Sequence, residues 1–433
     1  MKRALVLAVL AACDGATGTI SIGLTTAPGS HVLDPATRLR VSLTDPPLSY
    51  EVERHGDGFD LSFDLDATET TGSIVVEGLD ASGAVVAAGQ SPPFPFAAIN
   101  ANVVIYVAAP MTIAPAPVAL TPARSDLAAA ALPYGAIVAG GRDAAGAPSD
   151  AIAIYNVYNH TLTGGLAMPV SRSALVIAVD AGGGAYLYGG LDAAGNPVAT
   201  LLRFDTTIAP SGSYTMLGEQ PGFARSREIA VRTAANRFLV TGTPPAELAA
   251  GSIAARSEIA SLPPIGGSVT PADGIPTALF LGGDTGLVRF RKDAFDMLAG
   301  DTRTRAAIAP LPGGRFVVVG GGDATTPVLS ALVVDAETGA VTTIADVLST
   351  GRYAPAVAAT ARHLVVAGGV DATGAPIATA DILDATTLAP IATVPLTPRA
   401  GTMAFSLAND QVMIAGGSEA TDLIELFTPP PPP

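Results

Sequence analysis

An apolar run that ends in two glycines recurs along the chain and constrains its fold more than any other feature. In the copy HLVVAGG, the run ends at Gly368 and Gly369 and an Asp/Gly turn follows. Gly140 and Gly416 open the first and last pairs, 276 residues apart. With a degenerate copy at Gly242 there are seven marks, so six intervals give a mean period of 46 residues. A fixed period of this length is typical of repeat architectures. The paired glycines are Gly140, Gly141, Gly189, Gly190, Gly282, Gly283, Gly320, Gly321, Gly368, Gly369, Gly416 and Gly417.

An arginine precedes nearly every pair in constant phase. Arg352 and Arg399 lie 16 and 17 residues before their pairs, Arg305 lies 15 before its pair, and Arg225 and Arg227 compete for one place. Two markers in fixed phase are stronger evidence for a repeat than either alone. The arginines assigned to this position, together with Arg142 just after its own pair, are Arg124, Arg142, Arg172, Arg227, Arg305, Arg352 and Arg399.

Each copy is predicted to contain four short strands. SALVIAV and AYLY are apolar runs with GGG between them, which indicates a hairpin, and a second pair of runs follows. Four strands every 46 residues are typical of one blade of a β-propeller. A single blade cannot bury both of its faces, whereas a blade between two neighbours can.

With these residues in place, the repeat resembles that of the kelch-repeat β-propellers, in which a strand ends in Gly-Gly and an arginine opens the next blade. The chain departs from the kelch pattern because it has no Trp, and because only Tyr188 matches the tyrosine that precedes the pair. The resemblance implies a kelch-like propeller over residues 114–428, with seven blades, or six as the alternative.

The arginines have two interpretations. In kelch propellers the loops that bear these positions gather around the channel mouth, so the seven arginines are a candidate binding face for an anionic or acidic partner. Alternatively, each arginine hydrogen-bonds carbonyl groups of a neighbouring blade and stabilises the packing of the ring. The glycines are expected to be structural, and the Asp after each pair is expected to cap its own turn.

The N-terminus predicts export from the cytoplasm. Lys2 and Arg3 precede a short apolar run, which is typical of a secretory signal and too short for a membrane span. The sequence LAAC resembles the bacterial lipoprotein cleavage box. The resemblance implies removal of residues 1–12, a lipid on Cys13, a tether over 13–17 and a place in the cell envelope, in the inner or outer membrane. The alternative is an ordinary signal peptide with a chance cysteine.

Residues 18–113 show alternating apolar runs such as FDLSFDL, and they predict an all-β N-terminal domain that is an immunoglobulin-like sandwich. The last repeat provides only three strands, so Val118 to Leu120 is expected to supply the fourth and close the ring. Residues 429–433 are five prolines, expected to form an exposed tail.

No catalytic constellation is apparent. The four histidines are scattered, and no metal or cofactor is expected. Galactose oxidase has kelch-type blades but needs a Cys–Tyr cofactor, and the sole cysteine here lies in the signal region. The net charge of −15 argues against nucleic acid. The chain is therefore predicted to be a non-enzymatic envelope lipoprotein that binds a protein or glycan on the loop face of its propeller. The alternatives are a degenerate propeller enzyme acting on extracellular polysaccharide and a structural envelope component.

Overall fold

The structure is a computed structural model, and it describes residues 17–56, 58–59, 61–66, 70–95, 102–208, 211–281, 286–298 and 303–432. The protein is all-β, as predicted. Within these ranges the only helical element is the 3-10 turn η1 (Pro221–Phe223). None of the described residues forms a helix long and apolar enough to cross a membrane. The signal segment, Cys13 and the pair Gly282 and Gly283 lie outside the described residues.

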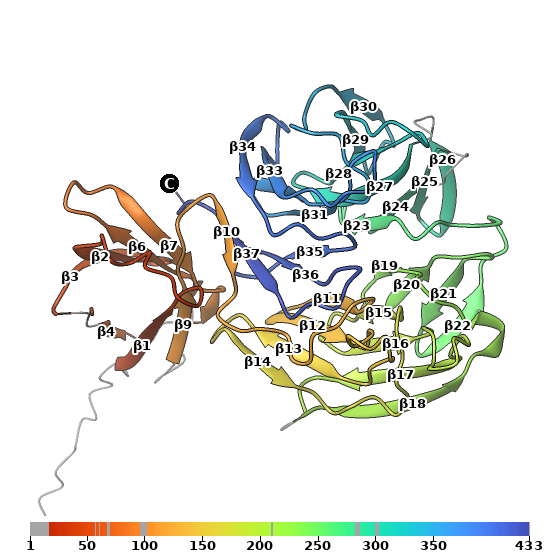
Figure 1. Cartoon of the computed structure of the whole chain (residues 1–433), viewed down its shortest axis with the longest axis horizontal. Coiled ribbons are helices and arrows are strands. Elements are labelled where there is room, and N and C mark those ends of the chain that lie inside the picture. The colour runs from red at the N-terminus through yellow and green to blue at the C-terminus, as the bar shows by residue number, and fades with distance from the viewer. Residues whose placement is uncertain are drawn as a thin grey trace, which may run out of the picture.

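Seven four-stranded antiparallel sheets make up the larger part of the chain (Figure 1). Their first strands are β11 (Ala128–Leu132), β15 (Val176–Val179), β19 (Ala230–Ala234), β23 (Gly266–Val269), β27 (Thr304–Leu311), β31 (Ala356–Ala359) and β35 (Met403–Ser406). Their second strands are β12 (Gly135–Ala139), β16 (Ala185–Tyr188), β20 (Arg237–Val240), β24 (Thr277–Leu281), β28 (Arg315–Gly322), β32 (His363–Ala367) and β36 (Val412–Ala415).

Two further strands complete each of these sheets. The third strands are β13 (Ile152–Asn156), β17 (Thr200–Asp205), β21 (Ala246–Ala249), β25 (Leu287–Arg291), β29 (Ala331–Asp335), β33 (Thr379–Asp384) and β37 (Ile424–Thr428). The fourth strands are β14 (Thr161–Gly164), β18 (Ser213–Glu219), β22 (Ser252–Ala255), β26 (Ala294–Leu298), β30 (Val341–Ile344), β34 (Pro390–Pro395) and β10 (Thr112–Pro115).

The seven sheets follow one another around a ring. Each first strand packs against the next first strand, and β35 packs against β11. The second strands carry the buried apolar runs, because both of their faces are covered by neighbouring sheets. For example, Leu364 and Val366 of β32 join Val317 and Val319 of β28 in one core. The apolar runs before the glycine pairs therefore form the hydrophobic core between neighbouring sheets.

The last sheet is completed by a segment from before the repeats. Strand β10 pairs antiparallel with β37, with Thr112 opposite Thr428 and Ile113 opposite Phe427. The sequence predicts Val118 to Leu120 in this role, so that prediction is corrected to Thr112–Pro115. The ladder ends at Pro115, and the main chain beyond it makes only isolated hydrogen bonds, from Ala116 to Ile424 and from Leu120 to Asp422.

The N-terminal residues form two sheets around a core of their own. One has the order β4-β1-β9 and the other β3-β2-β6-β7. Side chains from both sheets, such as Leu39, Ile74 and Ile105, bury each other in this core. The strands are β1 (Thr17–Thr25), β2 (Arg38–Thr44), β3 (Pro47–Glu53), β4 (Ser62–Asp66), β6 (Ile74–Leu79), β7 (Val85–Gln90) and β9 (Asn102–Tyr106), with the short pair β5 (Thr71–Gly72) and β8 (Phe94–Pro95).

A buried histidine connects this N-terminal part to the first sheet of the ring. The main-chain N–H of Tyr106 donates to Nε2 of His160 over 3.1 Å. Nε2 therefore carries a lone pair, so Nδ1 carries the proton and donates to the hydroxyl oxygen of Tyr155, 2.5 Å away. Burial lowers the pKa of His160 to about 4, and the ring stays neutral at ordinary pH.

The proline tail is not the exposed end that the sequence predicted. Pro429, Pro430 and Pro431 are half-buried. The guanidinium of Arg362 donates to the carbonyl oxygens of Pro430 and Pro431. The tail is held because proline carbonyls accept hydrogen bonds even though the residue has no N–H.

Candidate functional site

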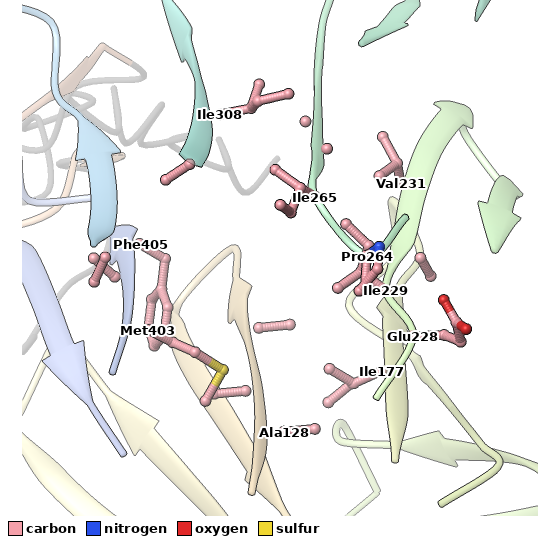
Figure 2. A pocket seen from close by; sticks show the side chains of 18 of the residues that line it. Ala128, Ile177, Glu228, Ile229, Val231, Pro264, Ile265, Ile308, Met403 and Phe405 are labelled. Carbon is pink, nitrogen blue, oxygen red and sulfur yellow. The ribbon is translucent and has the colours of Figure 1, made fainter. Parts of the chain in front are cut away.

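A cavity of about 1080 Å³ occupies the centre of the ring. All seven first strands, or the residues beside them, contribute to its wall. Figure 2 shows Met403 and Phe405 on one side and Ile177, Ile229 and Ile265 on the other. The volume is slightly above the range typical of small-molecule sites, about 300–1,000 Å³.

Most side chains along the wall of the cavity are apolar, with Ser268 of β23 as an exception. Alanines recur on β11 and β27, and branched or longer side chains come from the remaining strands. The apolar side chains that line it include Ala129, Ala130, Ile177, Val179, Ile229, Val231, Ile265, Ala307, Ile308, Val357, Met403 and Phe405. The first strands converge at the centre of the ring, where larger side chains would fill the space. The many alanines of the lining leave it open.

One end of the cavity, called here the first mouth, is built from a repeated backbone position. It is the residue two places after the repeat arginine, and φ is positive there in six sheets: Asp126, Ala174, Arg227, Arg305, Ala354 and Gly401. All six line the cavity. Neighbouring sheets are linked at this level by main-chain hydrogen bonds, from the N–H of Ala174 to the carbonyl of Asp126 and from the N–H of Arg227 to that of Ala174.

The side chains at the first mouth are charged. Arg227 donates to both carboxylate oxygens of Asp126, over 3.2 and 3.1 Å, and Nε of Arg142 lies 3.7 Å from Oδ2 of the same carboxylate. Arg305 is exposed, and its guanidinium carbon lies 4.4 Å from the centre of the Tyr353 ring. Among the residues that the structure describes, no carboxylate forms an ion pair with Arg305.

Thr402 adds a polar group at the same end. It follows Gly401, lines the cavity and is 8% exposed. Its Oγ1 is buried without a hydrogen-bond partner among the described residues. A buried hydroxyl in this state costs about 1–3 kcal/mol.

The opposite end, called here the second mouth, carries a closed ion pair. Asp180 is 6% exposed and accepts two hydrogen bonds from Arg203, over 3.1 and 2.7 Å. Arg232 of β19 also lines this end and is exposed. The third carboxylate of the lining, Glu228, directly follows Arg227 of the first mouth and accepts a hydrogen bond from the hydroxyl of Thr241. Each lining carboxylate is thus engaged by a donor of the protein.

Four of the seven predicted arginines are buried inside their sheets and do not face the cavity. Arg124, Arg172 and Arg352 are fully buried and Arg399 is 9% exposed. Nη1 of Arg124 donates to the carbonyls of Gly140 and Ala151, both over 2.7 Å. The other three make the matching pair of bonds in their own sheets. The structural interpretation holds for these four, but the accepting carbonyls belong to the arginine's own sheet and not to a neighbour.

Arg227 and Arg305 do not hold the repeat position that the sequence analysis gave them. Arg225 donates to the carbonyls of Thr241 and Pro244, and Arg303 to those of Gly320 and Ser330. Both lie 17 residues before their glycine mark, within the spacing of the other copies. A spacing of 16 or 17 residues, applied strictly, assigns Arg303 and not Arg305 to the repeat position.

The buried guanidinium groups differ in how their charge is balanced. Arg352 donates to Asp381 over 2.7 Å and Arg399 donates to Glu425, and both carboxylates are buried. Arg124 and Arg172 donate to carbonyl oxygens, and burial lowers the pKa of each to about 10. These arginines remain protonated at neutral pH.

The glycine pairs join one sheet to the next. The N–H of Gly141 donates to the carbonyl of Arg172, and that of Gly190 to the carbonyl of Arg225. At Gly140 φ is 60° and a Cβ would lie 2.4 Å from the carbonyl oxygen of Arg172. This close approach requires glycine.

The aspartates that follow the pairs cap their own turns, as predicted. Oδ1 of Asp143 accepts from the N–H groups of Ala145 and Ala147, both over 2.9 Å. Asp192, Asp323 and Asp371 make equivalent bonds, which lower the pKa of each of these carboxyls. Asp284 lies outside the described residues.

No family profile matches the chain, and no curated protein matches its sequence. A solved structure resembles it in fold: a novel fungal alcohol oxidase with catalytic diversity among the AA5 family, in complex with copper. The two share 15% sequence identity over 73% of this chain and 76% of that chain, with a TM-score of 0.55. At this identity the likeness concerns the fold alone.

This likeness corrects the predicted function. The sequence analysis predicted a non-enzymatic envelope protein that binds a protein or glycan on its loop face. The prediction is contradicted because the matching structure is that of an enzyme. The all-β fold of this chain is therefore no argument against catalysis.

The cavity residues do not fit a copper site. Copper in proteins prefers imidazole and thiolate ligands. The described lining of the cavity contains no His, Tyr or Cys. His160 is buried beside Tyr106 and Tyr155, and His363 is buried against Phe427. Nor do three or more His, Cys, Asp or Glu side chains of the described residues gather in a metal-binding arrangement.

Proposed function

We propose that the ring is a kelch-like β-propeller of seven blades and that the N-terminal sheets are an immunoglobulin-like sandwich attached to it. The 46-residue period and the seven four-stranded sheets support the first part. The two sheets with a shared core support the second. We place the boundary before Thr112, since β10 pairs with the last sheet.

The function that the geometry supports best is uptake of a small, largely apolar molecule into the central cavity. The observation that carries this proposal is a cavity of about 1080 Å³ whose wall is made of Ala, Val, Ile, Met and Phe side chains. An apolar ligand gains about 25 cal/mol for each Å² of apolar surface that it removes from water. The charged side chains stand at the ends. Along the wall, Ser268 of β23 and the unpaired main-chain edges of the first strands can form hydrogen bonds, and the other side chains are apolar.

Binding of an uncharged fluorescent probe tests this proposal. N-phenyl-1-naphthylamine brightens in apolar surroundings, and we expect saturable binding to the full chain. Ala307→Phe places a large side chain on the wall of the cavity at β27 and is expected to weaken binding at least about tenfold, or about 1.4 kcal/mol. Ala254→Phe makes the same change at an exposed position of the outer strand β22 and is the matched control.

The folded state of each variant is checked by its thermal transition. If Ala307→Phe unfolds, Ala129→Leu is the smaller substitution on the wall contributed by β11. Absence of saturable binding by the unmodified chain, or equal binding by the wall variant and its control, overturns the proposal.

We also propose that the protein is anchored in the cell envelope by a lipid on Cys13. The LAAC motif supports this, and Cys13 is the sole cysteine. Incorporation of a labelled fatty acid in a bacterial host, lost in Cys13→Ser, is the expected result. Label retained in that variant would contradict the assignment.

A further inference from the structure

We infer that the occupant of the cavity is an amphiphile with one carboxylate, and that the carboxylate is held at the first mouth by Arg305. This inference rests on the proposed uptake of an apolar molecule and adds the chemistry of its polar end. It places a single-chain carboxylate, with its hydrocarbon part along the apolar wall, in the centre of the ring.

Arg305 differs from its counterpart in the third sheet in having no carboxylate partner among the described residues. Arg227, the equivalent residue of the third sheet, donates two hydrogen bonds to the carboxylate of Asp126. Arg305 has only the Tyr353 ring, and the described residues provide it with no acidic partner. A guanidinium offers five N–H donors in a planar fork, which matches a carboxylate in two parallel hydrogen bonds.

Arg305 also lies where the apolar wall begins. Arg305 lies at the entrance to the cavity, in a left-handed conformation with φ of 56°. Its neighbours Ala306 and Ala307 continue directly onto the apolar wall. If the hydrocarbon part of a ligand lies on that wall, one end of the ligand therefore lies near Arg305. The ring of tyrosine under the guanidinium keeps one face of it dry.

A carboxylate also suits Arg305 better than a neutral polar group does. A carboxylate has two oxygens and about four acceptor positions. It can accept two parallel hydrogen bonds from the guanidinium and balance its charge, whereas a neutral alcohol accepts a single bond and balances no charge.

The second mouth lacks this combination. Its buried carboxylate, Asp180, already holds Arg203 in a two-bond pair. Arg232 is exposed there as a single cation and makes a matched control for Arg305, because both are exposed arginines in the lining of one cavity. The protein as a whole has a net charge of −15, so attraction of an anion depends on these local cations.

The experiment compares ligands of equal chain length on the full chain. Dodecanoate, dodecanol and dodecyl phosphate, each below its micelle concentration, compete with N-phenyl-1-naphthylamine at pH 8. We expect dodecanoate to displace the probe at about a tenfold lower concentration than dodecanol, a difference of about 1.4 kcal/mol. Arg305→Gln is expected to remove this preference, and Arg232→Gln to keep it.

The outcomes separate this inference from the proposal beneath it. If the unmodified chain does not take up the probe, the cavity proposal itself fails. If the probe binds but dodecanol competes as well as dodecanoate, uptake stands and the carboxylate inference is overturned. A preference that is lost in Arg232→Gln and kept in Arg305→Gln overturns the assignment to the first mouth. Displacement by dodecyl phosphate and not by dodecanoate overturns the choice of carboxylate.

Discussion

Arg303 and Arg305 are separated by one residue and occupy opposite environments. Arg303 is 3% exposed and donates to the carbonyl oxygens of Gly320 and Ser330, whereas Arg305 is exposed beside the Tyr353 ring at the cavity. The positive φ of Arg305 turns the chain between them, so that one side chain enters the sheet and the other leaves it. The same turn separates Arg225 from Arg227 in the third sheet.

Removal of a buried repeat arginine is expected to destabilise the protein strongly. Arg352→Ala leaves the buried carboxylate of Asp381 without its cation and frees the carbonyls of Gly368 and Thr379. Breaking a buried pair from one side costs about 3–5 kcal/mol. Arg305→Ala removes an exposed side chain and should change stability by no more than about 0.5 kcal/mol. Urea denaturation of both variants checks this, and equal losses would refute the division of roles.

The loss of stability on replacing a glycine of this repeat by alanine is expected to depend on the atoms around it as well as on φ. Gly140 and Gly146 both have positive φ, 60° and 82°, but a Cβ at Gly140 would lie 2.4 Å from the carbonyl oxygen of Arg172 and one at Gly146 would meet nothing. Gly146→Ala should cost about 1–2 kcal/mol through the left-handed conformation. Gly140→Ala should cost more, since the first and second sheets must move apart. Thermal unfolding compares the two, and similar melting temperatures would show that the contact is easily relieved.

His160 is expected to make stability depend on pH in the acid range. Its pKa is lowered by burial from 6.5 to about 4. Between these two values the unfolded chain binds a proton that the folded chain excludes, so the free energy of unfolding falls as pH falls. The contribution is complete above about pH 6.5 and decreases by up to about 1.4 kcal/mol per pH unit down to about pH 4.

Denaturation of the native chain and of His160→Gln at intervals from pH 8 to pH 4 checks this dependence. Because the carboxyl groups and His363 contribute to both proteins, the difference between the two curves isolates His160. We expect the variant to be less stable at pH 8, where Tyr106 and Tyr155 lose their partner. The gap should narrow toward pH 4, and a constant gap would contradict the role assigned to burial.

Deletion of residues 429–433 is expected to have a small and specific effect. The tail gives Arg362 two carbonyl acceptors, so its removal should destabilise the protein by about 1 kcal/mol. Arg362→Ala should have a similar effect in the full chain and almost none in the shortened one. Additive losses in this double-mutant cycle would show that the two do not act together.

The repeat is the part of the fold that could be predicted from local patterns. Glycine at Gly140 and the cap at Asp143 are required by backbone geometry within a few residues, and such requirements are visible as residue types at fixed spacing. The periodic arginine was visible for the same reason. Its two-bond role could not be distinguished from a binding role, because burial of a guanidinium depends on strands that lie 16 to 29 residues further along.

The cavity could not be predicted in this way. The alanines of β11 and the isoleucines of β19 and β23 look like those of any buried strand, and only their convergence from seven sheets leaves an open centre. The partner of β37 was placed some six residues too late, since Val118 to Leu120 and Thr112 to Pro115 are similarly apolar and the choice depends on pairing over some 300 residues. The proline tail was predicted to be exposed because Arg362, which donates hydrogen bonds to its carbonyl oxygens, is distant in sequence.

By itself, the sequence determined the all-β class, the 46-residue period, the turns at the glycine pairs and the aspartates that cap them. These features depend on backbone conformations and hydrogen bonds between residues close together in the chain. Only the tertiary structure decided which arginines are buried and which face solvent, how β10 joins the last sheet, and that an apolar cavity with Arg305 at its entrance lies at the centre. Those features depend on packing between segments far apart in sequence, where the environment of a side chain, and not its type, determines its role.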